Sequence, residues 1–145
     1  MIIETKDLGF VEVEESNVIH FPHGIYGFEG AKRYALLSDH DSSNPFLWLQ
    51  HADSREPCFV VTDAHRLFSD YSPEVTPQME ETIGLKTPDA LRILTIVTVP
   101  KDYRGLSLNL KCPILINAAD NVAAQVILED DTYPMRYYLF GRTGE

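Results

Sequence analysis

The side chains with the widest chemical range in this sequence are its histidines and cysteines. His51, Cys58 and His65 fall within one short stretch, and His20 precedes His23 by three residues. A zinc site needs three or four ligands in a compact spacing, and neither HExxH nor paired CxxC occurs here. In a strand, His20 and His23 would also point to opposite faces. We therefore expect no metal and no cofactor.

The sequence also carries no recognisable nucleophile. It contains no GxSxG elbow, no GxGxxG and no Walker loop. Cys58 and Cys112 each lie inside an apolar, strand-like run, so we expect buried free thiols. We expect a protein that is not an enzyme. One alternative stays open, because a general acid and base from distant residues cannot be recognised in a sequence. It is a small β-barrel hydrolase or a ligand-binding protein whose pocket uses His20, His51, His65 or Cys58.

Two apolar stretches are expected to position the rest of the chain. Leu91–Val99 and Cys112–Asn117 are rich in β-branched residues and apolar on both faces. Strands that are apolar on both faces lie at the centre of a fold. Pro100 ends the first stretch and Pro113 opens the second, where a missing N–H costs least. We therefore predict that these two stretches form the two central strands.

The remaining elements are short. The pattern predicts one clear helix at Thr76–Gly84, with Thr76 as its cap and Pro77 in its first turn. A helical turn is expected at Glu29–Lys32. Further strands are expected at Ile2–Thr5, Phe10–Val13, Val18–Phe21, Arg33–Leu37, Phe46–Gln50, Cys58–Thr62, Leu106–Leu110 and, as the last strand, Ala123–Leu128, with Tyr71–Val75 as an edge strand. Tyr137–Phe140 is an apolar run beside the C-terminus. The fold class is mostly β: an antiparallel β-barrel or sandwich with one or two short helices, formed by residues 1–145 as a single domain.

The composition limits the possible partners. The chain has 145 residues, is 44% hydrophobic and carries a net charge of −10. That charge opposes direct nucleic-acid binding, which depends on Lys and Arg. It would speed encounter with a basic protein, although solubility alone also explains such a charge. No secretory leader and no apolar run near the ~20 residues of a membrane span is present. We expect a cytoplasmic monomer that does not bind membranes.

Aromatic residues are the remaining candidates for function. Tyr26 and Phe28 lie on a loop rich in Gly and Pro, Pro22–Phe28, which is either packed beneath itself or offered to a partner. Phe46 and Trp48 share one face of a predicted strand whose other face is also apolar. That strand is therefore either central or has one face reserved for a partner.

Seven segments in order resemble the FliW family of flagellar assembly factors, and together they span nearly the whole chain. They are Ile3–Thr5, Phe21–Glu29, Pro45–Gln50, Phe59–Val61, Ile96–Pro100, Asn109–Asn117 and Leu128–Arg136. The departures are small. His23 stands where the family often has an acidic residue, and Cys112 where it often has alanine.

The resemblance implies a regulator that works by exchanging partners. Proteins of this family bind flagellin and, when free of it, bind CsrA, an RNA-binding repressor of flagellin translation. Binding CsrA antagonises it and so relieves repression. The family is thought to act on CsrA away from its RNA-binding surface. Flagellin is expected to present an amphipathic helix, which needs an apolar groove or patch.

We expect two sets of partner-binding residues. The apolar set is Tyr26, Phe28, Phe46, Trp48, Tyr137 and Phe140. The acidic set is Glu12, Glu14, Glu15, Glu129, Asp130 and Asp131. The alternative is that the aromatics form core and the acids only keep the protein soluble.

Overall fold

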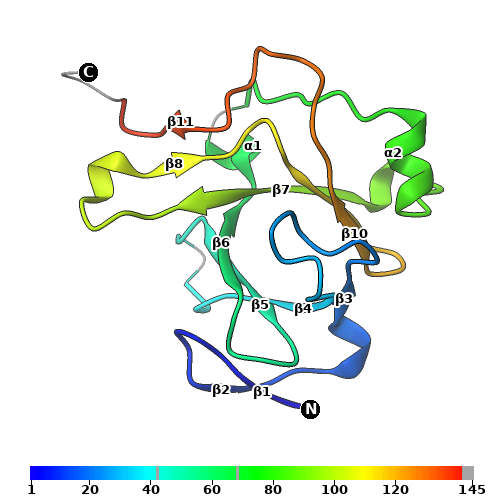
Figure 1. The fold of residues 1–145 in the computed structure, drawn as a ribbon, viewed down its shortest axis with the longest axis vertical. Helices are drawn as coiled ribbons and strands as arrows, with labels where there is room; N and C mark the ends of the chain where they lie inside the picture. Colours follow the sequence, from blue (N-terminus) through cyan, green and yellow to red (C-terminus); the bar gives the residue numbers. More distant parts are fainter. Residues whose placement is uncertain (42, 68, 142–145) are drawn as a thin grey trace.

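The computed structural model describes residues 1–41, 43–67 and 69–141, and within them strands close into a barrel (Figure 1). The closed ring runs β7-β6-β5-β4-β3-β10-β9 and returns to β7. Its members are β3 (Ile19–His20), β4 (Arg33–Leu37), β5 (Phe46–His51), β6 (Cys58–Thr62), β7 (Leu91–Thr98), β9 (Ile114–Asn117) and β10 (Val122–Gln125). The expected mostly β barrel is confirmed.

One pair in the ring is parallel. β3 and β10 run in the same direction, whereas the other neighbours in the ring are antiparallel. A closed ring of seven strands cannot alternate direction all the way round, so one parallel pair is a geometric requirement. It falls at β3, where His20 N–H donates to the Asn121 carbonyl at 2.8 Å.

The two apolar stretches form central strands, as predicted, and the structure also pairs them with each other. β7 pairs with β9 along residues 91–94, and its other end pairs with β6 and with β8 (Ser107–Leu108). β11 (Tyr137–Tyr138) adds to β8, and this extension projects to one side of the barrel in Figure 1. The barrel interior takes alternate residues, such as Leu94 and Ile96 of β7. Ile93 and Val97, which flank this pair in sequence, pack on the outside. Both faces are therefore apolar.

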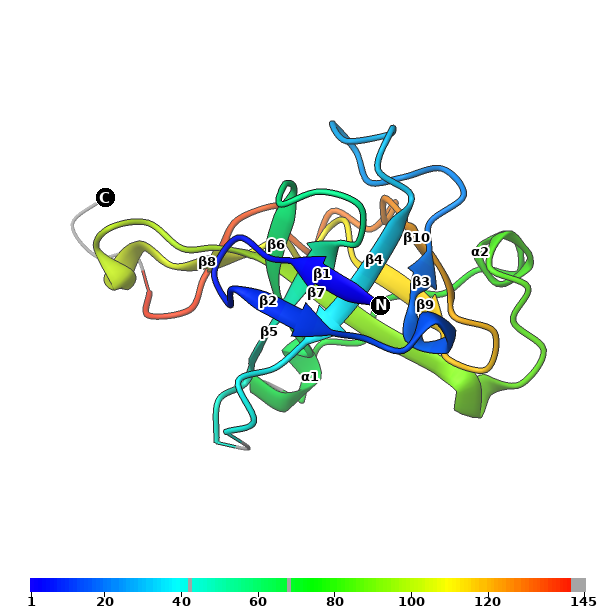
Figure 2. The same cartoon turned by 90° about the horizontal axis from the view of Figure 1, so that it is seen from below.

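Three layers cover the outside of the barrel. The hairpin of β1 (Ile2–Glu4) and β2 (Phe10–Glu12), with the 3-10 turn Glu15–Asn17, packs on β4. Figure 2 shows this hairpin lying over the barrel. The helix α1 (Ala64–Leu67) helps to cover β6 and β7, together with residues around Tyr71 and Leu108. The helix α2 (Pro77–Thr82) packs on β9 and β10.

The structure confirms the predicted N-terminal capping of the helix α2. The Thr76 hydroxyl accepts a hydrogen bond from Met79 N–H at 3.2 Å, and Pro77 occupies the first turn. Gly84 follows with φ +65°, a conformation that glycine adopts without strain. Two further 3-10 turns, Pro88–Ala90 and Tyr103–Gly105, flank β7.

Several expected elements differ. Tyr71–Val75 is not a strand, because Tyr71 is held by its buried side chain instead of by a ladder. Glu29–Lys32 forms no helical turn, because Glu29 and Gly30 lie in a turn closed by Ala31 N–H and the Phe28 carbonyl, and the chain then extends into β4. The strand expected at Leu106–Leu110 is only two residues long. The side chains of residues 106–110 do not alternate between buried and exposed, and most of them are buried. The barrel covers one side of this segment, and residues 129–139 cover the other.

Candidate functional site

The loop between β3 and β4 presents two aromatic side chains. Tyr26 is 56% exposed and Phe28 46% exposed, whereas Ile25 between the turns is buried. The Tyr26 N–H donates to Gln125 Oε1 at 3.0 Å, and the Phe28 ring packs edge-on against Phe59 with centroids 5.3 Å apart. The loop was expected either to pack beneath itself or to be offered to a partner. The structure shows both, because Ile25 is packed beneath the loop and Tyr26 is exposed at the surface.

The β5 aromatics are partly buried. Phe46 packs in the outer cluster that contains Ala64 and Leu108, whereas Leu47 and Leu49 face the barrel interior. The expected division of this strand into two apolar faces is confirmed. Phe46 therefore has a substantial role in the core. Trp48 is also half-buried.

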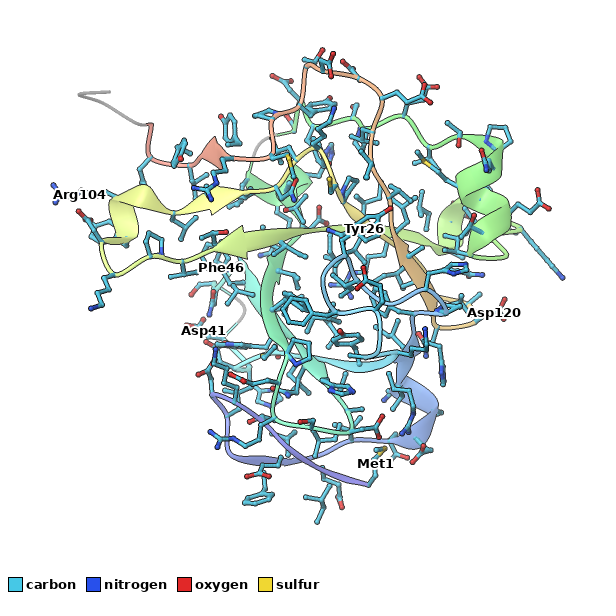
Figure 3. All side chains as sticks on the ribbon, viewed as in Figure 1. Met1, Tyr26, Asp41, Phe46, Arg104 and Asp120 are labelled. Atoms are coloured by element: carbon cyan, nitrogen blue, oxygen red, sulfur yellow. The ribbon has the colours of Figure 1, made fainter. Side chains whose placement is uncertain are left out.

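The C-terminal aromatics lie elsewhere. Tyr137 belongs to β11 and pairs with Leu108 in the ladder, and Phe140 is 54% exposed. The Phe140 ring packs at right angles to Tyr103, with centroids 5.5 Å apart. Figure 3 places Tyr26 and Phe46 on different parts of the molecule, and neither belongs to the β8–β11 extension. The structure therefore distributes the six aromatic residues over three places.

The six acidic residues divide into two sets. Glu12, Glu14 and Glu15 are exposed at the N-terminal hairpin, and Glu15 pairs with Arg33 at 2.7 Å. The other three acids follow β10 on an irregular segment at the opposite end of the molecule in Figure 1. There Asp131 pairs with Lys111 at 3.2 Å.

Two adjoining cavities lie where α2 faces the chain leaving β10, and we call them together the α2–β10 groove. Their volumes are about 420 and 370 Å³. Gln78, Met79 and Ile127 line both, so the two cavities are continuous along one wall. The first is completed by His23, Gly24, Tyr26, Glu29, Thr82, Ala124, Gln125 and Val126, and the second by Glu74, Thr76, Pro77, Leu128, Glu129 and Asp130.

This groove unites residues from both predicted sets. Tyr26 lies at one end, and Glu129 and Asp130 lie at the other. Hydrogen bonds from the Thr132 hydroxyl and N–H lower the pKa of Asp130, which is therefore ionised at neutral pH. Sequence reasoning did not select Glu74 or Ile127. Ile127 had one signal, an apolar residue just before an acidic run, and the structure leaves it 52% exposed.

The histidines and cysteines are dispersed. Among residues 1–41, 43–67 and 69–141, no three His, Cys, Asp or Glu side chains are placed to hold a metal ion. His51 Nδ1 lies 3.0 Å from the Glu56 carbonyl oxygen. Cys58 and Cys112 are free thiols, but only Cys112 is buried as expected, whereas Cys58 is half-buried at the start of β6. Burial raises the pKa of both, that of Cys58 to about 11. Both are therefore protonated at neutral pH.

No helix in the described part of the chain has the length and apolarity needed to cross a membrane.

Comparison with known proteins gives one family. The family model described as FliW protein matches residues 2–139. The Flagellar assembly factor FliW of Syntrophus aciditrophicus (strain SB) is 41% identical over 137 residues, covering 94% of this chain and 86% of the relative. That of Ruminiclostridium cellulolyticum is 33% identical over 139 residues, covering 96% and 94%.

A solved structure gives the same result. The crystal structure of a flagellar assembly factor FliW superposes with a TM-score of 0.89 at 27% identity, covering 99% of both chains. The barrel, its covering layers and the sequence therefore agree along the whole length. This chain belongs to the FliW family and is a flagellar assembly factor.

Proposed function

We propose that this protein binds flagellin and, when free of flagellin, binds and antagonises the translational repressor CsrA. The observation that carries the proposal is the family match over residues 2–139, together with relatives described as flagellar assembly factors. Binding to CsrA would relieve repression of flagellin synthesis, and accumulating flagellin would occupy the protein and restore repression. The output is then set by which partner is bound.

The charge of the chain supports the CsrA half of the proposal. A net charge of −10 steers encounter with a basic partner, and RNA-binding proteins carry basic patches. The acids proposed for this contact are Glu12, Glu14, Glu15, Glu129, Asp130 and Asp131, all of which are exposed.

Exposed apolar surface supports the flagellin half. An amphipathic helix needs apolar side chains to pack against. Tyr26, Phe28, Tyr137 and Phe140 offer them, each at least 38% exposed. Phe46 and Trp48 offer less, because they are half-buried. In this proposal the protein is a cytoplasmic monomer, acts by binding and has no catalytic step.

Separate titrations test this function. Purified protein is titrated by isothermal calorimetry with CsrA and, in a second experiment, with monomeric flagellin. The proposal expects a saturable complex with each partner at micromolar concentration or below. An absence of binding to both at micromolar concentration contradicts it.

A further inference from the structure

The α2–β10 groove has an apolar floor that is open to solvent. Ile127 is 52% exposed within it, and Met79 and Val126 are half-buried beside it. Exposed apolar side chains that line a concave surface mark an interaction site more often than isolated ones do.

The α2–β10 groove carries negative charge. Four carboxylates line it, those of Glu29, Glu74, Glu129 and Asp130, and no Lys or Arg is among its described lining residues. Glu29 Oε2 accepts a hydrogen bond from Gly27 N–H at 3.1 Å, and Asp130 Oδ1 accepts one from Thr132 N–H at 2.8 Å. These bonds favour the ionised carboxylates. The charge therefore complements a cationic ligand.

The walls of the groove are tied together. Gln125 holds the loop of Tyr26 through its Oε1, and its Nε2 donates to the Cys112 carbonyl at 3.2 Å. On the opposite wall, α2 is capped by Thr76 and packs through Met79 and Ile83. The site is therefore preformed by three segments that are distant in sequence, which lowers the cost of binding.

We propose that the α2–β10 groove is the docking site for a protein segment that carries Lys or Arg beside apolar side chains. This inference rests on the proposed function and assigns the groove to the basic partner, CsrA, instead of to flagellin. The cations of the segment meet Glu74, Glu129 and Asp130, and its apolar side chains cover Ile127 and Met79.

Charge reversal at two locations tests the assignment. One variant carries Glu74→Lys and Glu129→Lys in the groove. Its matched control carries Glu4→Lys and Asp7→Lys on the hairpin, which are not among the acids proposed above for CsrA, so both variants change the net charge equally. All four side chains are exposed. We expect the groove variant to bind CsrA at least about tenfold more weakly and the control within about threefold of the wild type. Flagellin affinity should stay within about twofold for both.

An apolar pair provides a second test. Ile127→Ser removes the exposed apolar side chain from the groove, and Phe10→Ser removes one that is 74% exposed on the hairpin. We expect Ile127→Ser to weaken CsrA binding about fivefold or more, and Phe10→Ser to leave it unchanged. Thermal unfolding of each variant verifies that it folds.

The outcomes separate the two proposals. If wild-type protein binds CsrA but the groove variants bind as tightly as the wild type, the docking site is refuted and the function stands. Equal losses from the groove and hairpin reversals also refute the site, because overall charge then explains the effect. If the groove variants lose flagellin instead of CsrA, the assignment of the partner is refuted. Failure of the wild type to bind either partner refutes the function itself.

Discussion

The hydroxyl of Tyr71 donates a buried hydrogen bond of 2.8 Å to the carbonyl of Leu110. The two residues are 39 positions apart, so this bond fastens the segment between α1 and α2 to the chain between β8 and β9. The Tyr71 ring also packs edge-on against Tyr133, with centroids 4.9 Å apart. A segment without a strand ladder is thus held by side-chain contacts, and the Ser72 N–H adds a hydrogen bond of 3.0 Å to the Tyr133 hydroxyl.

Removing that hydroxyl should destabilise the fold. Tyr71→Phe leaves the Leu110 carbonyl buried and without this partner, which costs about 1–3 kcal/mol. We expect a lower urea midpoint with an unchanged slope, measured by fluorescence or circular dichroism. A free energy of unfolding equal to that of the wild type would show that the bond contributes nothing.

Tyr34 provides the opposite case. Its side chain is buried in the barrel, and its hydroxyl has no hydrogen-bond partner among the described residues. Tyr34→Phe should therefore be neutral or stabilising by up to about 2 kcal/mol, because the orphan hydroxyl no longer has to be buried. The same urea titration measures it beside Tyr71→Phe. Equal destabilisation by both substitutions would contradict this comparison.

Alkaline pH should destabilise the protein through Cys58. Burial raises the pKa of its thiol from 9.0 to about 11, with a smaller contribution from Asp7. Above pH 9 the unfolded chain loses the proton first, so the unfolded state is favoured and stability falls as the pH rises toward 11. Unfolding free energies from pH 8 to pH 11 should fall less steeply for Cys58→Ala than for the wild type. Parallel profiles would contradict the raised pKa.

Two glycines of the Tyr26 loop should respond differently to alanine. Gly24 has φ +67°, and an added Cβ would lie 2.6 Å from the Glu29 Cα. Gly27 has φ +89°, but an added Cβ would meet nothing within 4 Å. Gly27→Ala should cost about 1–2 kcal/mol from backbone strain alone, and Gly24→Ala clearly more. Thermal unfolding compares them, and equal losses would refute the close approach to Glu29.

Strands could be predicted from the sequence where their own residues form a continuous run of strand formers between two turn signals. Arg33–Leu37 and Cys58–Thr62 have the expected bounds, because each is a compact run of strand-forming residues ended by turn signals. The central position of β7 and β9 was predictable because both stretches are apolar on both faces, whereas their pairing is a tertiary contact that the local pattern does not show. Tyr71–Val75 was wrong because its side-chain contact lies with Leu110, which a local pattern cannot show.

The candidate site was predicted only in part. Tyr26, Glu129 and Asp130 were selected by residue type, and the structure places them along one groove. Their common site depends on α2 packing against β10, a tertiary contact between segments far apart in sequence. Glu74 was missed for this reason. Phe46 was selected as a surface aromatic, although the packing of α1 and β8 covers part of it.

The exchange of partners is the central claim, and a competition titration tests it most directly. A preformed complex with labelled CsrA is titrated with monomeric flagellin, and the mass of the labelled species is followed by sedimentation velocity. The account predicts that flagellin displaces CsrA with no ternary complex, because each partner lowers the apparent affinity for the other. A stable complex of all three proteins, with unchanged affinity for each partner, would contradict the account.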